Sequence, residues 1–128
     1  MLLIALAIFA PKMPALVRAD FDGDGRMDIA RVATDGRQGY RLIVTRAADP
    51  DHPVTVHRMR SIRYFYIATA RPGTYRSACD KGYGPDRAPC AYRRVRVTAN
   101  TLSFGYRESS DAVAVWNKRR FDVVWLTD

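Results

Sequence analysis

The sequence predicts a single all-β domain, built as an antiparallel β-sandwich or barrel-like structure of about eight short strands. Apolar residues alternate with polar ones over short runs that are rich in β-branched and aromatic side chains. Turn signals separate these runs at close spacing, and no stretch shows sustained helical periodicity. The length of 128 residues suits one domain, and 48% hydrophobic residues are enough to form its core.

Eight segments have strand character. They are residues 27–33, 40–45, 54–59, 64–69, 94–97, 102–106, 112–116 and 122–126. Asp35-Gly36 is a turn signal between the first two, and residues 117–120 form a charged hairpin loop between the last two. Pro72-Gly73 occupies the two central positions expected of a type II turn.

The N-terminal residues predict export to the periplasm or beyond the cell. Residues 2–9 are an unbroken apolar run, shorter than the roughly 20 residues that cross a bilayer, and typical of a signal-peptide core. Val17-Arg18-Ala19 fits the small-x-small cleavage rule, so we assign residues 1–19 to a signal peptide or its remnant and residues 20–128 to the β-domain. A basic segment before the run is missing, and a buried first strand or helix is the alternative.

The chain has two cysteines, Cys79 and Cys90. An exported chain meets an oxidising compartment, and neither cysteine has another partner, so we predict a disulfide between them.

An acidic segment near the N-terminus has the spacing of a calcium loop. Aspartates stand at positions one, three, five and nine of this segment, namely Asp20, Asp22, Asp24 and Asp28. Gly25 is sixth, where the chain must bend, and the carbonyl of Arg26 would supply the seventh-position oxygen. Arg31 replaces the twelfth-position glutamate of an EF-hand, and a strand follows, so the pattern is similar instead to the loops of FG-GAP β-repeats. The alternative is an acidic turn without a metal.

The loop between the cysteines is a candidate binding surface. Gly82 and Gly84 flank Tyr83, which leaves the ring uncovered on a stapled loop and makes it a candidate anchor for a partner. Lys81 and Arg87 lie beside it in the sequence. The alternative is a tyrosine that packs back onto the core.

The net charge of +8 predicts an anionic partner. Arginine and lysine cluster at residues 58–63, 93–96 and 118–120. For an exported chain, anionic cell-wall polymer or an acidic protein fits better than nucleic acid, and a basic surface without a partner is the alternative. We expect the free chain to be monomeric.

The sequence lacks the motifs of an enzyme. It contains no Gly-x-Ser-x-Gly elbow, no His-Glu-x-x-His and no phosphate-binding loop. His52 and His57 are read as surface or edge residues, and Glu108 is the sole glutamate. We therefore predict a protein that is not an enzyme.

Two stretches carry a family resemblance. They are residues 72–84, Pro-Gly-Thr-Tyr-Arg-Ser-Ala-Cys-Asp-Lys-Gly-Tyr-Gly, and a C-terminal set: Glu108-Ser109-Ser110, Trp116-Asn117, Phe121 and Val124 to Asp128. With the acidic loop, the chain resembles the periplasmic immunity proteins of bacteria-killing type IV secretion systems, which are similar in turn to inhibitors of invertebrate-type lysozyme. One departure is residues 85–89, which are richer in proline and charge than the resemblance implies.

The resemblance implies a β-sandwich with calcium at one edge and a loop, Gly82 to Gly84, that plugs a peptidoglycan hydrolase. The chemistry agrees, because a lysozyme-type cleft holds two carboxylates. A phenol can hydrogen-bond to either carboxylate, and Lys81 or Arg87 can pair with the ionised one. A calcium-stabilised exported module that binds cell-wall polymer or acts in adhesion is the second hypothesis.

Overall fold

The computed structural model describes residues 12–37, 39–83 and 89–127, which form ten β-strands in three antiparallel sheets. The all-β prediction is confirmed, with ten strands in place of about eight. Within these ranges no helix is long and apolar enough to cross a membrane.

The first sheet contains four strands in sequence order. They are β1 (Val17–Ala19), β2 (Asp28–Thr34), β3 (Tyr40–Thr45) and β4 (Val54–Met59). Alternation along β2 buries Ala30 and Val32 on one face and leaves Arg31 exposed on the other. This sheet therefore has one face in the core and one toward solvent, as an antiparallel sheet commonly does.

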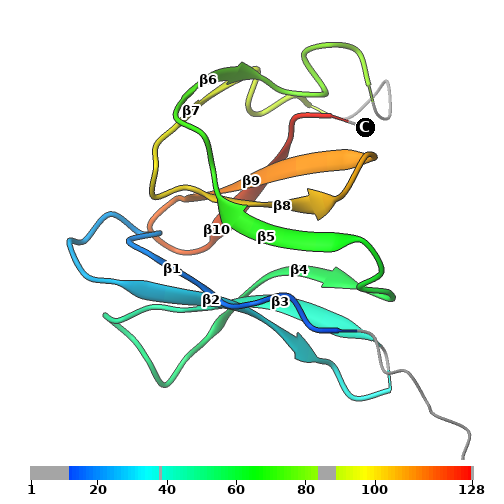
Figure 1. Ribbon diagram of the computed structural model, residues 1–128. Coiled ribbons are helices and arrows are strands. Elements are labelled where there is room, and N and C mark those ends of the chain that lie inside the picture. Colours follow the sequence, from blue (N-terminus) through cyan, green and yellow to red (C-terminus); the bar gives the residue numbers. More distant parts are fainter. Residues whose placement is uncertain (1–11, 38, 84–88, 128) are drawn as a thin grey trace, which may run out of the picture.

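The second sheet has the order β10-β9-β8-β5, and the third contains β6 and β7. The bounds are β5 (Phe65–Thr69), β6 (Gly73–Arg76), β7 (Arg94–Val97), β8 (Leu102–Tyr106), β9 (Ser110–Trp116) and β10 (Phe121–Trp125). Figure 1 shows three layers, with the second sheet between the other two.

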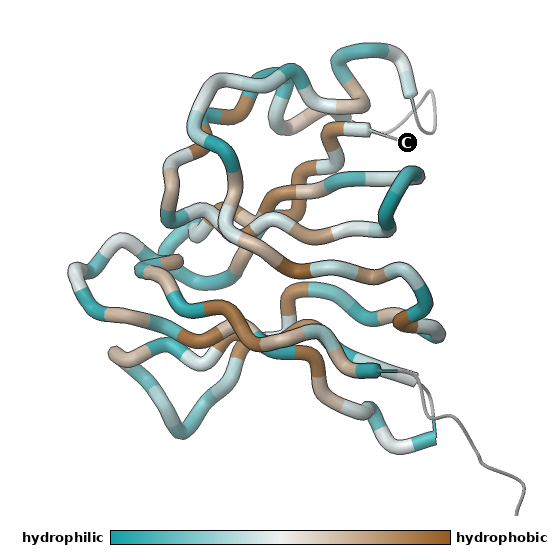
Figure 2. Tube along the Cα trace, in the orientation of Figure 1, coloured by the Kyte–Doolittle hydropathy of each residue, from teal (hydrophilic) through white to brown (hydrophobic). Residues whose placement is uncertain are grey.

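Two hydrophobic clusters hold these layers together. Leu42 of β3 and Phe104 of β8 are fully buried in the larger cluster, between the first and second sheets. Val95 of β7 packs with Val113 of β9 in the smaller cluster, under the third sheet. Figure 2 shows hydrophobic residues along the stacked strands and hydrophilic residues at many of the turns that join them.

Strand β9 is central because it contributes to both clusters. Ala112 and Ala114 belong to the larger cluster, whereas Val113 belongs to the smaller one. A strand that is buried on both faces needs apolar side chains at successive positions, which explains the sequence Ala-Val-Ala-Val at residues 112–115.

The two additional strands are β1 and β6. Strand β1 lies inside residues 17–19, at the end of the segment assigned to a signal peptide, and Ala19 pairs with Asp28 and is 3% exposed. A cut after Ala19 would remove this edge strand, while residues 1–11 of the predicted signal lie outside the described residues. The prediction of a type II turn at Pro72-Gly73 is wrong. Gly73 has a φ of 157°, which is nearly extended, whereas a type II turn needs about +80° at this position, and Gly73 begins β6.

Candidate functional site

Three aspartates of the acidic loop converge. Each of Asp20, Asp22 and Asp28 offers a carboxylate oxygen, and these oxygens lie within 4.8 Å of one another. The pairing of β1 with β2 explains this, since Ala19 is opposite Asp28 and the residues between them must loop back. Asp28 is the first residue of β2 and is fully buried.

The backbone of the loop bends where the sequence predicts. Gly25, at the sixth position, has a φ of 87°, and Gly23 has a φ of 74°. Both values belong to the left-handed region that glycine adopts without a steric penalty. The Asp20 carboxylate accepts hydrogen bonds from the backbone N–H groups of Asp24, at 3.1 Å, and Gly25, at 2.8 Å.

Asp24 lies outside the group of converging carboxylates. Its carboxylate accepts the backbone N–H of Arg26 at 2.9 Å and pairs with the Arg26 guanidinium at 3.3 Å. Of the predicted ligands, the structure therefore brings three together and leaves Asp24 and Arg26 paired with each other.

Arg46 completes the site, although no sequence pattern indicated it. Its Nε donates to Asp22 Oδ2 at 2.9 Å, and the Asp22 side chain is 1% exposed. Its guanidinium also lies 4.1 Å from the centre of the Trp116 ring. No local signal could have identified Arg46, because it follows β3 and is 24 residues away from Asp22.

The ionisation of the two buried carboxyls differs. Burial opposes the charged form of Asp22, but hydrogen bonds from Arg46 and from the backbone of Asp24 outweigh burial and lower the pKa of Asp22. Burial raises the pKa of Asp28, and the neighbouring Asp22 carboxylate adds to this rise, although the backbone N–H groups of Ala47 and Asp22 oppose it.

The arrangement can hold a metal ion. Its donors are carboxylate oxygens, the ligands that hard divalent cations prefer. One arginine faces three carboxylates, so part of their mutual repulsion is left for a cation to relieve.

The disulfide between Cys79 and Cys90 is present, as predicted. A single helical turn positions Cys79. Ser77 Oγ accepts the N–H of Asp80 at 3.1 Å, as an N-cap does, and also lies 3.1 Å from Cys79 Sγ. Gly82 ends the turn with a φ of 86°, and the N–H of Tyr83 donates to the carbonyl of Ala78 at 2.9 Å, as in a Schellman motif.

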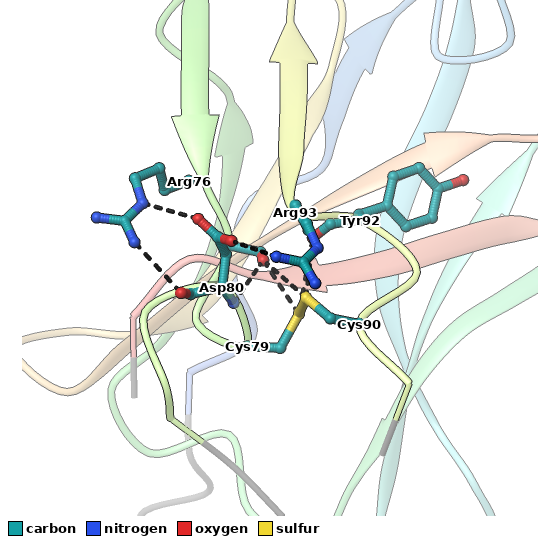
Figure 3. Close-up of a disulfide and its surroundings, with 7 residues drawn as sticks. Arg76, Cys79, Asp80, Cys90, Tyr92 and Arg93 are labelled. Carbon is teal, nitrogen blue, oxygen red and sulfur yellow. Dashed lines mark hydrogen bonds and ion pairs between the residues drawn. A yellow bond between two sulfur atoms is a disulfide. The ribbon is translucent and has the colours of Figure 1, made fainter. Parts of the chain in front are cut away.

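Charged side chains brace the same turn. Arg76 Nε donates to Asp80 at 2.8 Å, and Arg93 lies 3.7 Å from the other oxygen of that carboxylate. Figure 3 shows the two arginines around Asp80, with the disulfide beside them and the Tyr92 ring pointing away. The Arg76 hydrogen bond outweighs desolvation and lowers the pKa of Asp80.

Tyr83 is exposed, which agrees with the reading of an uncovered ring. The residue is 54% exposed and lines a hollow of about 450 Å³ together with Ser110, Trp125 and Thr127. Lys81 Nζ donates to the carbonyl of Leu126 at 2.9 Å, which ties the loop to the end of β10. Gly84 and Arg87 lie outside the described residues.

The remaining candidates have ordinary surroundings. His57 is on the edge strand β4, and its ring packs against Phe104 and Trp125 with ring centres 5.3 and 5.7 Å away. His52 is exposed and pairs with Asp49. Glu108 is exposed in the turn between β8 and β9.

Comparisons of the chain with protein-family models, with curated proteins and with solved structures give no match. What the protein does has to be inferred from the two loops and from the charge around them.

Proposed function

We propose that this protein is an exported inhibitor, an immunity protein, of a lysozyme-like peptidoglycan hydrolase. The observation that carries the proposal is an exposed tyrosine, Tyr83, inside the loop that the disulfide between Cys79 and Cys90 closes. The resemblance to immunity proteins of type IV secretion systems, described above, supports the same reading. The loop around Tyr83 would enter the active site of the hydrolase.

The backbone from Ser77 to Tyr83 is held in place before it binds. Three features restrict the backbone that presents Tyr83: the disulfide, the N-cap hydrogen bond to Ser77 and the Schellman motif at Gly82. A pre-organised segment loses little conformational entropy on binding, so more of its contact energy appears as affinity. A tyrosine adds a large rigid ring and a hydroxyl that can hydrogen-bond to a catalytic carboxyl.

The charge around the loop favours an acidic partner. The net charge is +8, and Asp80 beside the disulfide is already paired with Arg76 and Arg93. A positive field of this kind accelerates encounter with an acidic cleft and weakens with salt.

Within the same proposal, the acidic loop binds calcium. Asp20, Asp22 and Asp28 would be the first ligands, with Asp24 and the carbonyl of Arg26 as the remaining ones. The ion would stabilise the loop that leads into β2 and has no part in inhibition. Calcium suits the all-oxygen donor set and the loop spacing.

The test is inhibition of purified enzymes: an invertebrate-type lysozyme and bacterial lysozyme-fold peptidoglycan hydrolases. The wild-type protein should inhibit at least one of them stoichiometrically. Tyr83→Ala should weaken inhibition by about thirtyfold or more at an unchanged melting temperature, as expected for an anchor tyrosine at about 1.4 kcal/mol per tenfold.

Tyr75→Ala is the matched control. The Tyr75 ring packs against the smaller cluster, and its hydroxyl donates to the carbonyl of Arg71 at 2.8 Å. This variant should lose stability first. The proposed role of Tyr83 would be overturned if Tyr83→Ala inhibited normally but melted at a lower temperature.

A second candidate is an exported module that binds anionic cell-wall polymer. It is favoured by the ribbon of β6 and β7, where Arg76 pairs in register with Arg94 and both are exposed, as is Arg96. Co-sedimentation with purified peptidoglycan, without inhibition of any hydrolase, would support it. In either case we expect no turnover of peptidoglycan fragments, and turnover that Glu108→Gln abolished would show an enzyme.

A further inference from the structure

We propose that the inhibitory surface has a second anchor, Tyr64, which binds an acidic patch at the rim of the same hydrolase. This inference rests on the function proposed above. It concerns the turn between β4 and β5, where the sequence predicts a basic cluster at residues 58–63 but assigns Tyr64 to no site.

Tyr64 has an unusual backbone conformation. Its φ is 64°, in the left-handed region that residues other than glycine and asparagine rarely adopt. It is the third residue of a tight turn in which the N–H of Phe65 donates to the carbonyl of Ile62 at 3.0 Å. The N–H of Arg107 donates to the carbonyl of Tyr64 at 2.9 Å and holds this conformation.

The fold gains little from a tyrosine at this position. Tyr64 is 62% exposed, and the centre of its ring lies 5.1 Å from the guanidinium of its neighbour Arg63, which also donates to the Tyr64 hydroxyl at 3.3 Å. A glycine would adopt the same turn without strain. Because neither the turn nor the packing requires the ring, the ring is better explained by a partner than by stability.

The surroundings of Tyr64 indicate the chemistry of that partner. Arg60, Arg63 and Arg107 are exposed and form no ion pair with any residue in the described ranges. Tyrosine and arginine are the residue types enriched at the centres of protein interfaces. Arginine forks pair with carboxylates in bidentate geometry, so an acidic protein surface is complementary to this cluster.

The β8–β9 turn links the Tyr64 turn with the hollow that Tyr83 lines. Arg107, which holds the Tyr64 turn, begins the connection from β8 to β9 that ends at Ser110. Ser110 and Tyr83 line the same hollow. In Figure 1 the β4–β5 turn, the β8–β9 turn and residues 77–83 lie along one side of the molecule. Among the tyrosine, phenylalanine and tryptophan residues that the structure describes, Tyr64 and Tyr83 are the two that are exposed.

Substitution by glycine tests this inference because it separates binding from folding. Tyr64→Gly should weaken inhibition about tenfold or more, whereas its melting temperature should be unchanged or higher, since the strain is relieved. Tyr64→Phe keeps the ring and should inhibit nearly as well as the wild type.

Lys118→Gly is the matched control for the backbone effect. Lys118 also has a positive φ, 81°, but lies in the turn between β9 and β10, at the opposite end of β9 from Ser110. The Lys118→Gly variant should be more stable than the wild type and should inhibit equally well.

The outcomes separate this inference from the proposed function. If Tyr83→Ala loses inhibition and Tyr64→Gly does not, only the second anchor is overturned. If the wild-type protein inhibits none of the hydrolases tested, the proposed function fails and the second anchor fails with it. A fall in the melting temperature of Tyr64→Gly would also overturn the inference, because the ring would then contribute to folding.

Discussion

The guanidinium of Arg46 lies 4.1 Å from the centre of the Trp116 ring. Arg46 directly follows β3 in the first sheet, and Trp116 ends β9 in the second, so this cation–π contact joins the two sheets. The same arginine donates to the buried Asp22 at 2.9 Å. The acidic loop is therefore coupled through one side chain to the packing of the sandwich.

We expect Arg46→Ala to make the protein depend on calcium. In chelator, the variant should lose about 3 kcal/mol of unfolding free energy, because Asp22 stays buried without its partner. Added calcium should then raise stability by more in the variant than in the wild type, since the ion replaces the lost positive charge. Urea unfolding in chelator and in calcium measures both effects.

Arg58→Ala is the control for this experiment, because Arg58 is an exposed arginine paired with Asp35. It should cost less than about 1 kcal/mol in either condition. Equal calcium effects in wild type and Arg46→Ala would contradict the coupling.

Asp28→Asn should remove calcium binding more completely than Asp24→Asn. Asp28 is fully buried in the converging group, whereas Asp24 is paired with Arg26 outside it. Wild-type protein should gain about 2.7 kcal/mol of unfolding free energy when free calcium is 100 times its Kd. This gain should vanish in Asp28→Asn and persist in part in Asp24→Asn. Calorimetric titration tests the order, and no heat with folded wild-type protein would exclude a calcium site.

Replacing both cysteines by serine should lower the unfolding free energy by about 3 kcal/mol, because the short loop between Cys79 and Cys90 is then open in the unfolded chain. Inhibition should weaken as well, since the Tyr83 loop becomes less rigid. Denaturant unfolding and inhibition assays measure the two effects. If the folded double variant inhibited as well as the wild type, the disulfide would serve stability alone.

His57 should make the protein less stable in mild acid. Burial against Phe104 and Trp125 lowers the pKa of His57 below its usual 6.5. The folded state then binds fewer protons than the unfolded state. This contribution to stability is therefore complete above pH 6.5 and is lost as the pH falls through the folded-state pKa.

Melting temperatures between pH 7.5 and pH 5 measure this contribution. His57→Phe should flatten the decline with falling pH, whereas His52→Gln should not. The exposed His52 has a pKa raised by its hydrogen bond to Asp49, so its own contribution has the opposite sign. A decline of equal slope in wild type and His57→Phe would assign the acid sensitivity to other groups.

Local features of the sequence determined much of this protein. Alternation and turn residues predicted eight of the ten strands, because these signals depend on neighbours along the chain. The spacing of aspartates and glycines predicted the bend of the acidic loop, and two cysteines without competitors predicted the disulfide. The uncovered ring of Tyr83 followed in the same way from its glycine neighbours.

Only the tertiary structure decided which distant residues meet. Strand β8 pairs with β5 after the chain has left to form β6 and β7, and no local pattern encodes that return. Arg46 reaches Asp22 because β2 and β3 pair in the first sheet, and it reaches Trp116 because the second sheet stacks on the first. The backbone of Arg107 donates to the carbonyl of Tyr64, whose φ is positive. These contacts join residues far apart in the chain, so they depend on how the sheets pack, which propensity and spacing do not specify.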